Sequence, residues 1–379
     1  MKLAHLSKNN LIILSLITFF FAYETHFYSV FFQILSIFGV FLLFLFNFSN
    51  LKRVVGLEKS LIIKLYYLLI VFQIISIFIN SPFDTLLVIE VLRNVFLVFL
   101  VIIIPSIPYY FENLAVKFIS FFSLVGILFF VSGNSLIWVN EYEGRLASIF
   151  FDPNYFGLFC AFAIVVSFRK KSYFFLLINL GALLLSFSKG AFLGLALAFV
   201  IPFFIVRLTL QNFRQRMYFI LFLLPCLSLL YYYLTSNNLV GFFRVDSGFN
   251  GRDGMWYFLI ENIISNPLGF GSGRIAEFLL SNGFTNTSSH NFFVDYAFSF
   301  GIVPLLIVLY LFALRIYVEI KLIYNQKRYQ PSIFILFFVC SNFIVISPIG
   351  FSLLSIIYFR EIVNASMNNT DSLNYSDRT

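Results

Sequence analysis

Long apolar stretches alternate with short polar ones along most of the chain. A helix that crosses roughly 30 Å of hydrocarbon needs about 20 mostly apolar residues. Stretches of this kind predict membrane-spanning helices at 10–23, 27–47, 61–80, 85–104, 114–132, 149–168, 172–187, 190–206, 217–234, 291–314, 331–347 and 350–364. We therefore expect an all-α polytopic membrane protein with about twelve transmembrane helices, in a range of about eleven to thirteen.

One polar stretch is longer than the others and divides the chain into regions. We expect transmembrane helices one to nine in residues 1–234, a large outer loop at 235–290, helices ten to twelve at 291–364 and a polar tail at 365–379. The rest of the chain then consists of spans joined by short connections.

The large loop carries a helical pattern of its own. Arg252-Asp253-Gly254 leads into MWYFLIENIIS, in which apolar positions recur at helical spacing beside polar Glu261 and Asn262. These apolar positions are Trp256, Leu259, Ile260 and Ile263. The pattern predicts a helix that lies at the membrane surface and ends at Asn266-Pro267. A glycine-rich stretch follows, and then a second short helix is expected around 274–280.

The composition limits the class of protein. With 60% hydrophobic and 11% charged residues, the 379-residue chain has too little charge for a soluble domain of this length. Its three cysteines, Cys160, Cys226 and Cys340, lie inside apolar runs without the paired spacing of a disulfide framework or a zinc site. The first apolar run follows Lys2 and Lys8, as in a signal peptide, but no small-residue cleavage site follows it. We therefore expect an uncleaved first span.

The charges predict the orientation of the spans, because short loops rich in Lys and Arg stay in the cytoplasm. Cations in one set of alternate loops are Lys52, Arg53, Lys59, Arg169, Lys170, Lys171, Arg207, Arg214, Arg216, Arg315, Lys321, Lys327 and Arg328. Acids in the other set are Glu24, Asp84, Glu141, Glu143, Asp246, Asp253, Glu261 and Glu277. The second set then faces outward, and both termini lie inside. Topology thus accounts for the net charge of +8 without a nucleic-acid partner.

The stretch GRLASIFFDPNYFGLFC (144–160) combines an arginine with a helix-start signal. Asp152 is a preferred N-cap and Pro153 a preferred first helical residue, so regular helix is expected to begin at Pro153. Residues 146–151 would then be irregular, which a membrane protein tolerates where protein or a water-filled cavity surrounds the backbone. The helix N-terminus and Arg145 could bind an anion such as phosphate. Alternatively, Arg145 only extends to the interface and the Asp-Pro-Asn sequence is an ordinary cap.

Two more cations are expected on the outer face, which otherwise avoids positive charge. Lys189 lies in the tight turn between the seventh and eighth spans, and Arg252 opens the surface helix. Each could simply sit at the interface. Together with Arg145 they suit a pyrophosphate, whose charge needs several donors.

His290 stands at the start of the tenth span, in the pair His290-Asn291. It could be a structural helix cap, or it could act as a general base, since its pKa lies near working pH. No second histidine or carboxylate stands at ligand spacing around it, so we expect neither a metal site nor haem. Glu24 and His26 form a small polar outer loop and are weaker candidates.

Four segments between 144 and 304 occur in a characteristic order: Arg145 with FFDPNYFG, then SFSKGAFLGL, GRDGMWYFLIENIISNPLGFGSG and SSHNFFVDYAFSFGIVP. Each motif is loose, but the ordered set with this topology resembles the O-antigen polymerase and O-antigen ligase superfamily. Those proteins are membrane enzymes of surface polysaccharide assembly with the type C glycosyltransferase (GT-C) fold. The first 140 residues match only as hydrophobic spans.

The resemblance implies roles for individual residues. In the superfamily, outer-face arginines hold the pyrophosphate of a polyprenyl-linked glycan, and the histidine of a His-Asn pair activates the acceptor. These roles fall on Arg145, Arg252 and His290. The superfamily's serine-arginine turn is Ser188-Lys189 here, which keeps the charge but loses the bidentate fork. Further substrate contacts are expected from Lys189, Asn154, Asp152, Asp253, Trp256, Asn291 and Arg274.

The expected function is therefore an inverting, cofactor-free and metal-independent glycosyl transfer at the outer face of the cytoplasmic (inner) membrane. The donor would be an oligosaccharide on undecaprenyl diphosphate, and a chain-length regulator and a flippase are candidate partners. A polymerase joins repeat units and a ligase transfers polymer to lipid A-core; the compact loop favours a polymerase. O-antigen, capsule and exopolysaccharide are not separated by the sequence.

A transporter, such as a flippase for lipid-linked sugars, is the alternative from another class. Transporters place ionisable groups near the bilayer midplane and often have repeated halves. Only Glu90 and Arg93 are expected to be buried within a span, and at this spacing on one helix they can pair with each other. The remaining polar residues gather outside, which favours the enzyme.

Overall fold

The computed structural model describes residues 61–80, 91, 94–95, 111–132, 145–150, 152–210, 252–271, 273–285, 288–326, 329–342, 354–358 and 360–362. Within these ranges the chain forms helices and loops. The helices are α4 (Leu61–Asn80), α6 (Phe111–Val131), α7 (Pro153–Arg169), α8 (Tyr173–Ser186), α9 (Lys189–Leu210), α12 (Arg252–Ser265), α13 (Ile275–Ser281), α14 (Phe292–Phe300), α15 (Ile302–Gln326) and α16 (Ile333–Cys340).

The described helices are those of a helical membrane protein. Three are long and apolar enough to cross a bilayer, at Phe111–Val131, Lys189–Arg207 and Ile302–Tyr324, and three shorter ones are apolar. The spans predicted at 10–23, 27–47, 85–104 and 217–234 lie wholly or mostly outside the described residues. The expected number of about twelve spans therefore stays a prediction.

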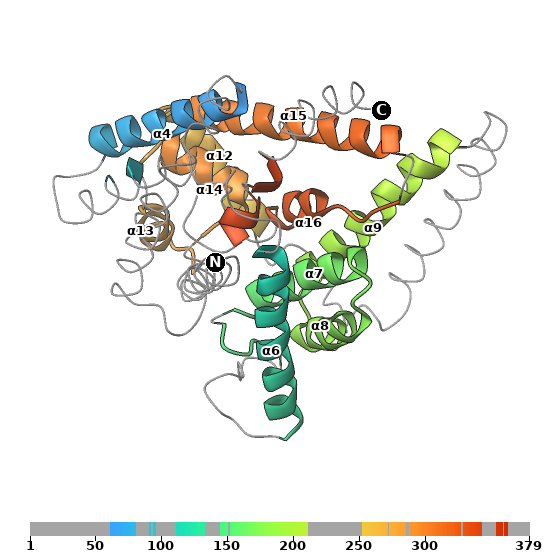
Figure 1. Ribbon diagram of the computed structural model, residues 1–379. Helices are drawn as coiled ribbons and strands as arrows, with labels where there is room; N and C mark the ends of the chain where they lie inside the picture. Colours follow the sequence, from blue (N-terminus) through green and yellow to red (C-terminus); the bar gives the residue numbers. More distant parts are fainter. Residues whose placement is uncertain are drawn as a thin grey trace, which may run out of the picture.

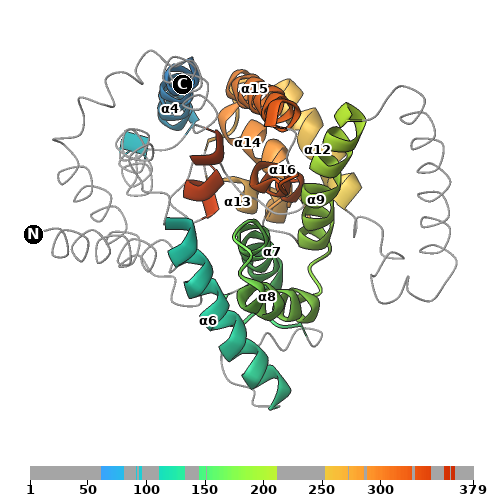
Figure 2. The same cartoon turned by 45° about the vertical axis from the view of Figure 1, so that its right-hand side comes forward.

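Helix α7 lies at the centre of the bundle. It packs against α6, α8, α9 and α16, and Figure 2 shows it between α6 and α9 with α8 below. Its residues from Phe156 to Ser167 are all buried. A helix that is apolar on every side belongs in the interior, so α7 carries the core. The outward faces of α6 and α8 expose residues such as Leu128 and Phe174, as lipid-facing helices do.

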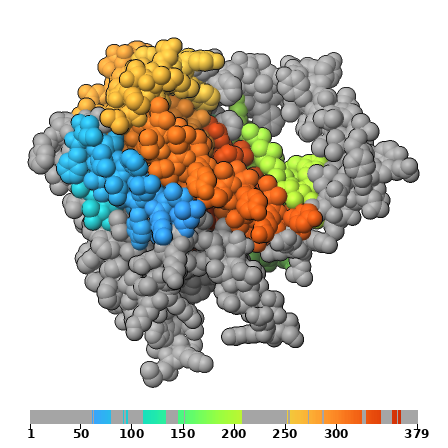
Figure 3. Space-filling model, turned by 90° about the horizontal axis from the view of Figure 1, so that it is seen from above, coloured from blue at the N-terminus to red at the C-terminus, as the bar shows by residue number. Residues whose placement is uncertain are grey.

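Helices α4 and α15 lie side by side along the top of the molecule in Figure 1 and contact each other. From above, α4 (blue), α15 (orange) and α12 (yellow) share one face of the described part (Figure 3). Helix α14, which contacts α4, α12 and α15, connects these elements. This arrangement places the helix of the large loop, α12, against the segment that follows His290.

The tenth span, predicted as one helix at 291–314, is divided in two. Gly301 has φ +92° and separates α14 from α15. A Cβ at this position would lie 2.4 Å from the carbonyl oxygen of Pro267. The backbone N–H of Phe270 donates to Phe298 O (2.8 Å), and that of Ile302 donates to Pro267 O (2.9 Å). The glycine-rich stretch after α12 therefore binds the end of α14 and breaks the helix there.

Two other boundaries differ from the sequence expectation. Arg315 and Lys321, predicted in a loop, lie on α15, which continues to Gln326; Arg315 pairs with Glu319 one turn away, and such a pair supports a helix. The span predicted at 331–347 is helical only to Cys340 within the described residues. The Ser341 hydroxyl donates to Phe337 O (2.7 Å), so a side chain satisfies one of the last helical carbonyls.

A cluster of buried charges joins α6, α7, α15 and the segment 360–362. Glu112 at the start of α6 pairs with Arg360 at 3.0 Å, and both are buried. Arg315 also lies near Glu361, and its Nε donates to the Glu361 carbonyl at 2.6 Å. The Nε of Arg169 donates to Pro331 O at 2.8 Å. The contacts of Arg360 and Glu361 attach the end of the described chain to the bundle.

The pair formed by Glu112 and Arg360 gives a test of this attachment. Arg360→Ala leaves the Glu112 carboxylate buried without its ion-pair partner, and breaking a buried pair in this way costs about 3–5 kcal/mol. We expect a clearly lower thermal unfolding temperature in detergent. The matched control is Lys117→Ala, which removes an exposed cation from the same helix α6. Equal unfolding temperatures for the two variants would contradict the proposed attachment.

The break at Gly301 gives a second test. Gly301→Ala adds a Cβ at a left-handed φ and against backbone, which we expect to destabilise the protein by more than about 1 kcal/mol. Gly283→Ala is the control, since Gly283 has φ +84° but no atom within 4 Å of the added Cβ. Thermal unfolding of both variants separates the effect of the contact from the effect of φ. A Gly301 variant no weaker than the Gly283 variant would show that this close contact is unimportant.

Candidate functional site

The segment before α7 has the irregular backbone that its sequence predicts. Residues 146–150 are buried, and Ser148 has φ +53°. The N–H of Leu146 donates to Leu185 O at 2.9 Å, so neighbouring protein satisfies part of this backbone. Asp152 is the N-cap of α7: its Oδ1 accepts the N–H of Asn154 at 2.6 Å, with proline at the first helical position. The predicted helix start is confirmed.

Arg145 links the start of α7 to the turn that precedes α9. Its Nε donates to Ser186 O at 2.9 Å, and one Nη donates to Asn154 Oδ1 at 2.9 Å. The same Nη also lies 3.5 Å from Phe187 O. The guanidinium is thus held between two chain segments. These contacts are not those of an arginine that only extends to the membrane interface.

Two helix N-termini meet beside Arg145. The turn Phe187-Ser188 connects α8 to α9, as predicted, and Lys189 is the first residue of α9. The Ser188 hydroxyl donates to Asn154 O, in the first turn of α7, at 3.5 Å. Each N-terminus carries partial positive charge, and Lys189 is exposed there with no acid in the first turn of α9. The start of α9 therefore favours an anion, whereas the start of α7 is already capped by the Asp152 carboxylate.

Arg252 and His290 are both far from Asp152 in the sequence, but they lie within electrostatic range of its carboxylate. Burial lowers the pKa of the Arg252 guanidinium, and the Asp152 carboxylate opposes this shift. Burial also lowers the pKa of His290; Arg252 lowers it further and Asp152 raises it. The imidazole is therefore neutral near pH 7 and able to accept a proton. Asp152 is two residues from Asn154, which binds Arg145. The Asp152 carboxylate therefore connects the region around Arg145 with Arg252 and His290.

The loop that carries His290 is fixed by its neighbours. Asn291 is the N-cap of α14, because its Oδ1 accepts the N–H groups of Phe293 (2.9 Å) and Val294 (3.3 Å). The alternative that His290 itself caps the helix is therefore wrong. His290 has φ +56°, an uncommon backbone conformation for a residue with a side chain.

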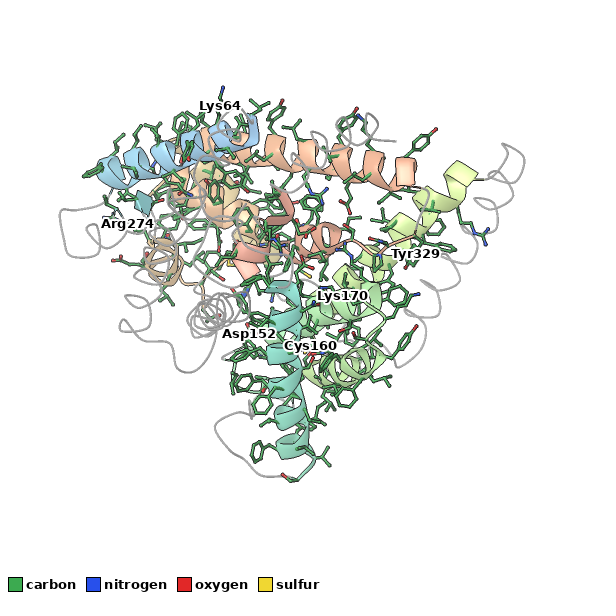
Figure 4. All side chains as sticks on the ribbon, viewed as in Figure 1. Lys64, Asp152, Cys160, Lys170, Arg274 and Tyr329 are labelled. Atoms are coloured by element: carbon green, nitrogen blue, oxygen red, sulfur yellow. The ribbon has the colours of Figure 1, made fainter. Side chains whose placement is uncertain are left out.

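The other predicted site residues are placed differently. The Nε1 of Trp256 donates to Ser289 O at 2.8 Å, so this indole holds the His290 loop. Asn154 Oδ1 accepts from Arg145. Arg274 precedes α13 and lies to the side of Asp152 in Figure 4, and no described contact joins it to the cluster. Asp253 is described only by its helical position on α12.

Sequence reasoning missed several groups that build the site. The carbonyls of Ser186 and Phe187 bind Arg145, and main-chain groups leave no signal in a sequence. Asp295, whose Oδ1 accepts the N–H of Ser289 at 2.9 Å, was also missed. A lone acid in an apolar stretch is the signal that could have identified it.

Comparison with known proteins finds a family that part of the chain resembles. Residues 174–309 match the family model described as O-antigen ligase. The matched range contains Lys189, α12 and the His290 loop, whereas Arg145 and Asp152 precede it. No curated protein matches the chain. The family match confirms, over residues 174–309, the resemblance to the O-antigen polymerase and ligase superfamily that the sequence motifs carry.

Proposed function

We propose that the protein is a polysaccharide polymerase that joins undecaprenyl-diphosphate-linked repeat units at the outer face of the inner membrane. The observation that carries the proposal is the position of Asp152: its charge acts on both Arg252 and His290, and its helix start binds Arg145. These interactions support an anion site and a neutral imidazole that are both close to Asp152. The family match supports a glycosyltransferase-like polymerase or ligase activity.

The chemistry requires only a leaving-group site and a base. The acceptor hydroxyl attacks the anomeric carbon from the face opposite the diphosphate, so a new glycosidic C–O bond forms as the C–O bond to phosphate breaks. The electron pair stays on the lipid diphosphate, where Arg145, Arg252 and Lys189 stabilise the charge. His290 accepts the hydroxyl proton. Neither a nucleotide nor a metal ion enters this step.

The second candidate is an O-antigen ligase, which is the activity that the description of the matching family model names. Both reactions use the same donor and differ in the acceptor, which is another repeat unit for a polymerase and lipid A-core for a ligase. The outer loop at 235–290, although the largest in the chain, is compact, and this favours the polymerase because little protein surface is available to hold a lipid A-core acceptor. A flippase or other transporter would form no glycosidic bond.

Glycan analysis of a deletion strain separates these functions. Loss of a polymerase leaves a single repeat unit on core. Loss of a ligase leaves bare core and polymer that accumulates on the carrier lipid, and that result would replace our assignment with the ligase. Elongation by purified protein, with substrate supplied only on the outer side of a sealed bilayer, would exclude a transporter.

Substitutions at the proposed site should reduce turnover strongly. We expect Arg145→Ala and His290→Ala each to lower elongation in a reconstituted assay by about 100-fold or more, as for loss of one well-placed transition-state donor or base. Arg207→Ala, which removes an exposed cation from the opposite end of α9, should keep the wild-type rate. Full activity of correctly inserted Arg145 and His290 variants would remove the proposed site.

The pH dependence of elongation should report the charges around His290. Since the pKa of His290 is lowered from 6.5, kcat/KM should stay high as the pH falls to 6.5 and decrease only below it. Asp152→Asn removes a charge that raises this pKa, so the inflection should move to lower pH. Arg252→Gln should move the inflection of its residual activity to higher pH. Unchanged or reversed shifts would argue against His290 as the titrating base.

A further inference from the structure

His290 has a backbone conformation that its surroundings must maintain. A residue with a Cβ at φ +56° lies in the sparsely populated left-handed region. Such residues persist where neighbouring groups determine the backbone, and they are common at functional sites. The contacts of the preceding residue, Ser289, show which groups do so here.

Two side chains from different helices hold Ser289 by its main chain. Its N–H donates to Asp295 Oδ1, in the first turn of α14, at 2.9 Å. Its carbonyl accepts the indole N–H of Trp256, on α12, at 2.8 Å. Ser289 is fully buried, and its hydroxyl donates to Asn291 O at 2.9 Å. The peptide groups on both sides of Ser289 are therefore fixed, which leaves little freedom for His290.

Trp256 also relates the His290 loop to Arg252. The two residues are four apart on α12, so they lie on the same face, one turn from each other. The bond from Trp256 to Ser289 consequently sets how far the Arg252 end of α12 lies from the loop. Arg252 and Asp152 both act electrostatically on His290. The spacing between the Arg252 end of α12 and the His290 loop therefore affects how strongly Arg252 acts on the imidazole.

We infer that Trp256 and Asp295 are positioning residues for the reaction proposed above, on which this inference rests. They hold the Ser288–Asn291 loop so that the His290 imidazole faces Arg252 and Asp152. Neither residue touches the reacting atoms. Trp256 is thus a positioning residue and not the substrate contact expected from the sequence. Asp295, which is 8% exposed, has the same positioning role.

The substitutions that test the inference each remove one bond. Trp256→Phe keeps an aromatic ring and deletes the N–H. Asp295→Ala deletes the acceptor for Ser289, and Asp295→Asn keeps an oxygen acceptor without the charge. Tyr257→Phe is the matched control, since it removes one polar hydrogen from the neighbouring aromatic residue, which is 73% exposed.

Two measurements are made on protein purified in detergent. Elongation kinetics with donor and acceptor varied separately give kcat and each KM, and hydrogen exchange gives the protection of a peptide spanning 284–296. Trp256→Phe and Asp295→Ala should lower kcat at least about 10-fold, because small displacements of a catalytic group are costly. The donor KM should not change, exchange in the peptide should be faster, and Asp295→Asn should recover most of kcat. The Tyr257 control should match the wild type.

Several outcomes would overturn the inference. Wild-type kcat and unchanged exchange in Trp256→Phe would show that the bond to Ser289 is dispensable, even if Asp295→Ala fails to fold. A higher donor KM at normal kcat would make Trp256 a substrate contact, and an Asp295→Asn enzyme as slow as Asp295→Ala would mean that the charge itself is used. A wild-type protein that elongates no lipid-linked glycan would instead refute the proposed function, so the two failures are distinct.

Discussion

The hydrogen bonds of Arg145 are the interaction on which the site depends. One guanidinium binds the carbonyl of Ser186 at the end of α8 and the side chain of Asn154 in the first turn of α7. These contacts bring the start of α7 beside the turn that precedes α9, and the two helices also pack against each other. Two helix dipoles and a cation then add their fields at one place. Asp152 lies at the edge of that region and connects it to α12 and the His290 loop.

The parts of the fold that the sequence predicted correctly are encoded locally. Asp152 and Pro153 begin α7, and Asn266-Pro267 follows the last turn of α12, because caps and prolines act within a few residues. The break between α14 and α15 was not predicted. It depends on main-chain bonds such as that from Phe270 to Phe298 O, which join segments distant in sequence. Arg315 was placed in a loop for a different reason: it ends an apolar run, but a charged residue that ends an apolar run need not end the helix.

The sequence predicted which residues form the proposed site better than it predicted how they contact one another. Positive charge on a face expected to carry few cations identified Arg145, Lys189 and Arg252, and a histidine at the start of a predicted span identified His290. The resemblance then assigned roles to Arg145, Arg252 and His290. The sequence did not indicate that Trp256 binds Ser289 O, since a tryptophan on an amphipathic helix equally fits a substrate or membrane contact. Arg274, also expected to contact substrate, lies to the side of Asp152 in Figure 4, and no described contact joins it to the cluster. Charge pattern and motif order therefore find candidates, and long-range packing decides which of them meet.

The discontinuity at Gly301 has a mechanical consequence. A transmembrane helix adjusts its tilt to the thickness of the surrounding lipid, and α15 is long enough to span the bilayer. If α14 and α15 were one continuous helix, each change in its tilt would also move the loop that carries His290. The left-handed glycine interrupts the helix, while α14 stays bound to the stretch after α12. The segment that follows His290 is therefore held by the stretch after α12 and is not a rigid continuation of the spanning helix.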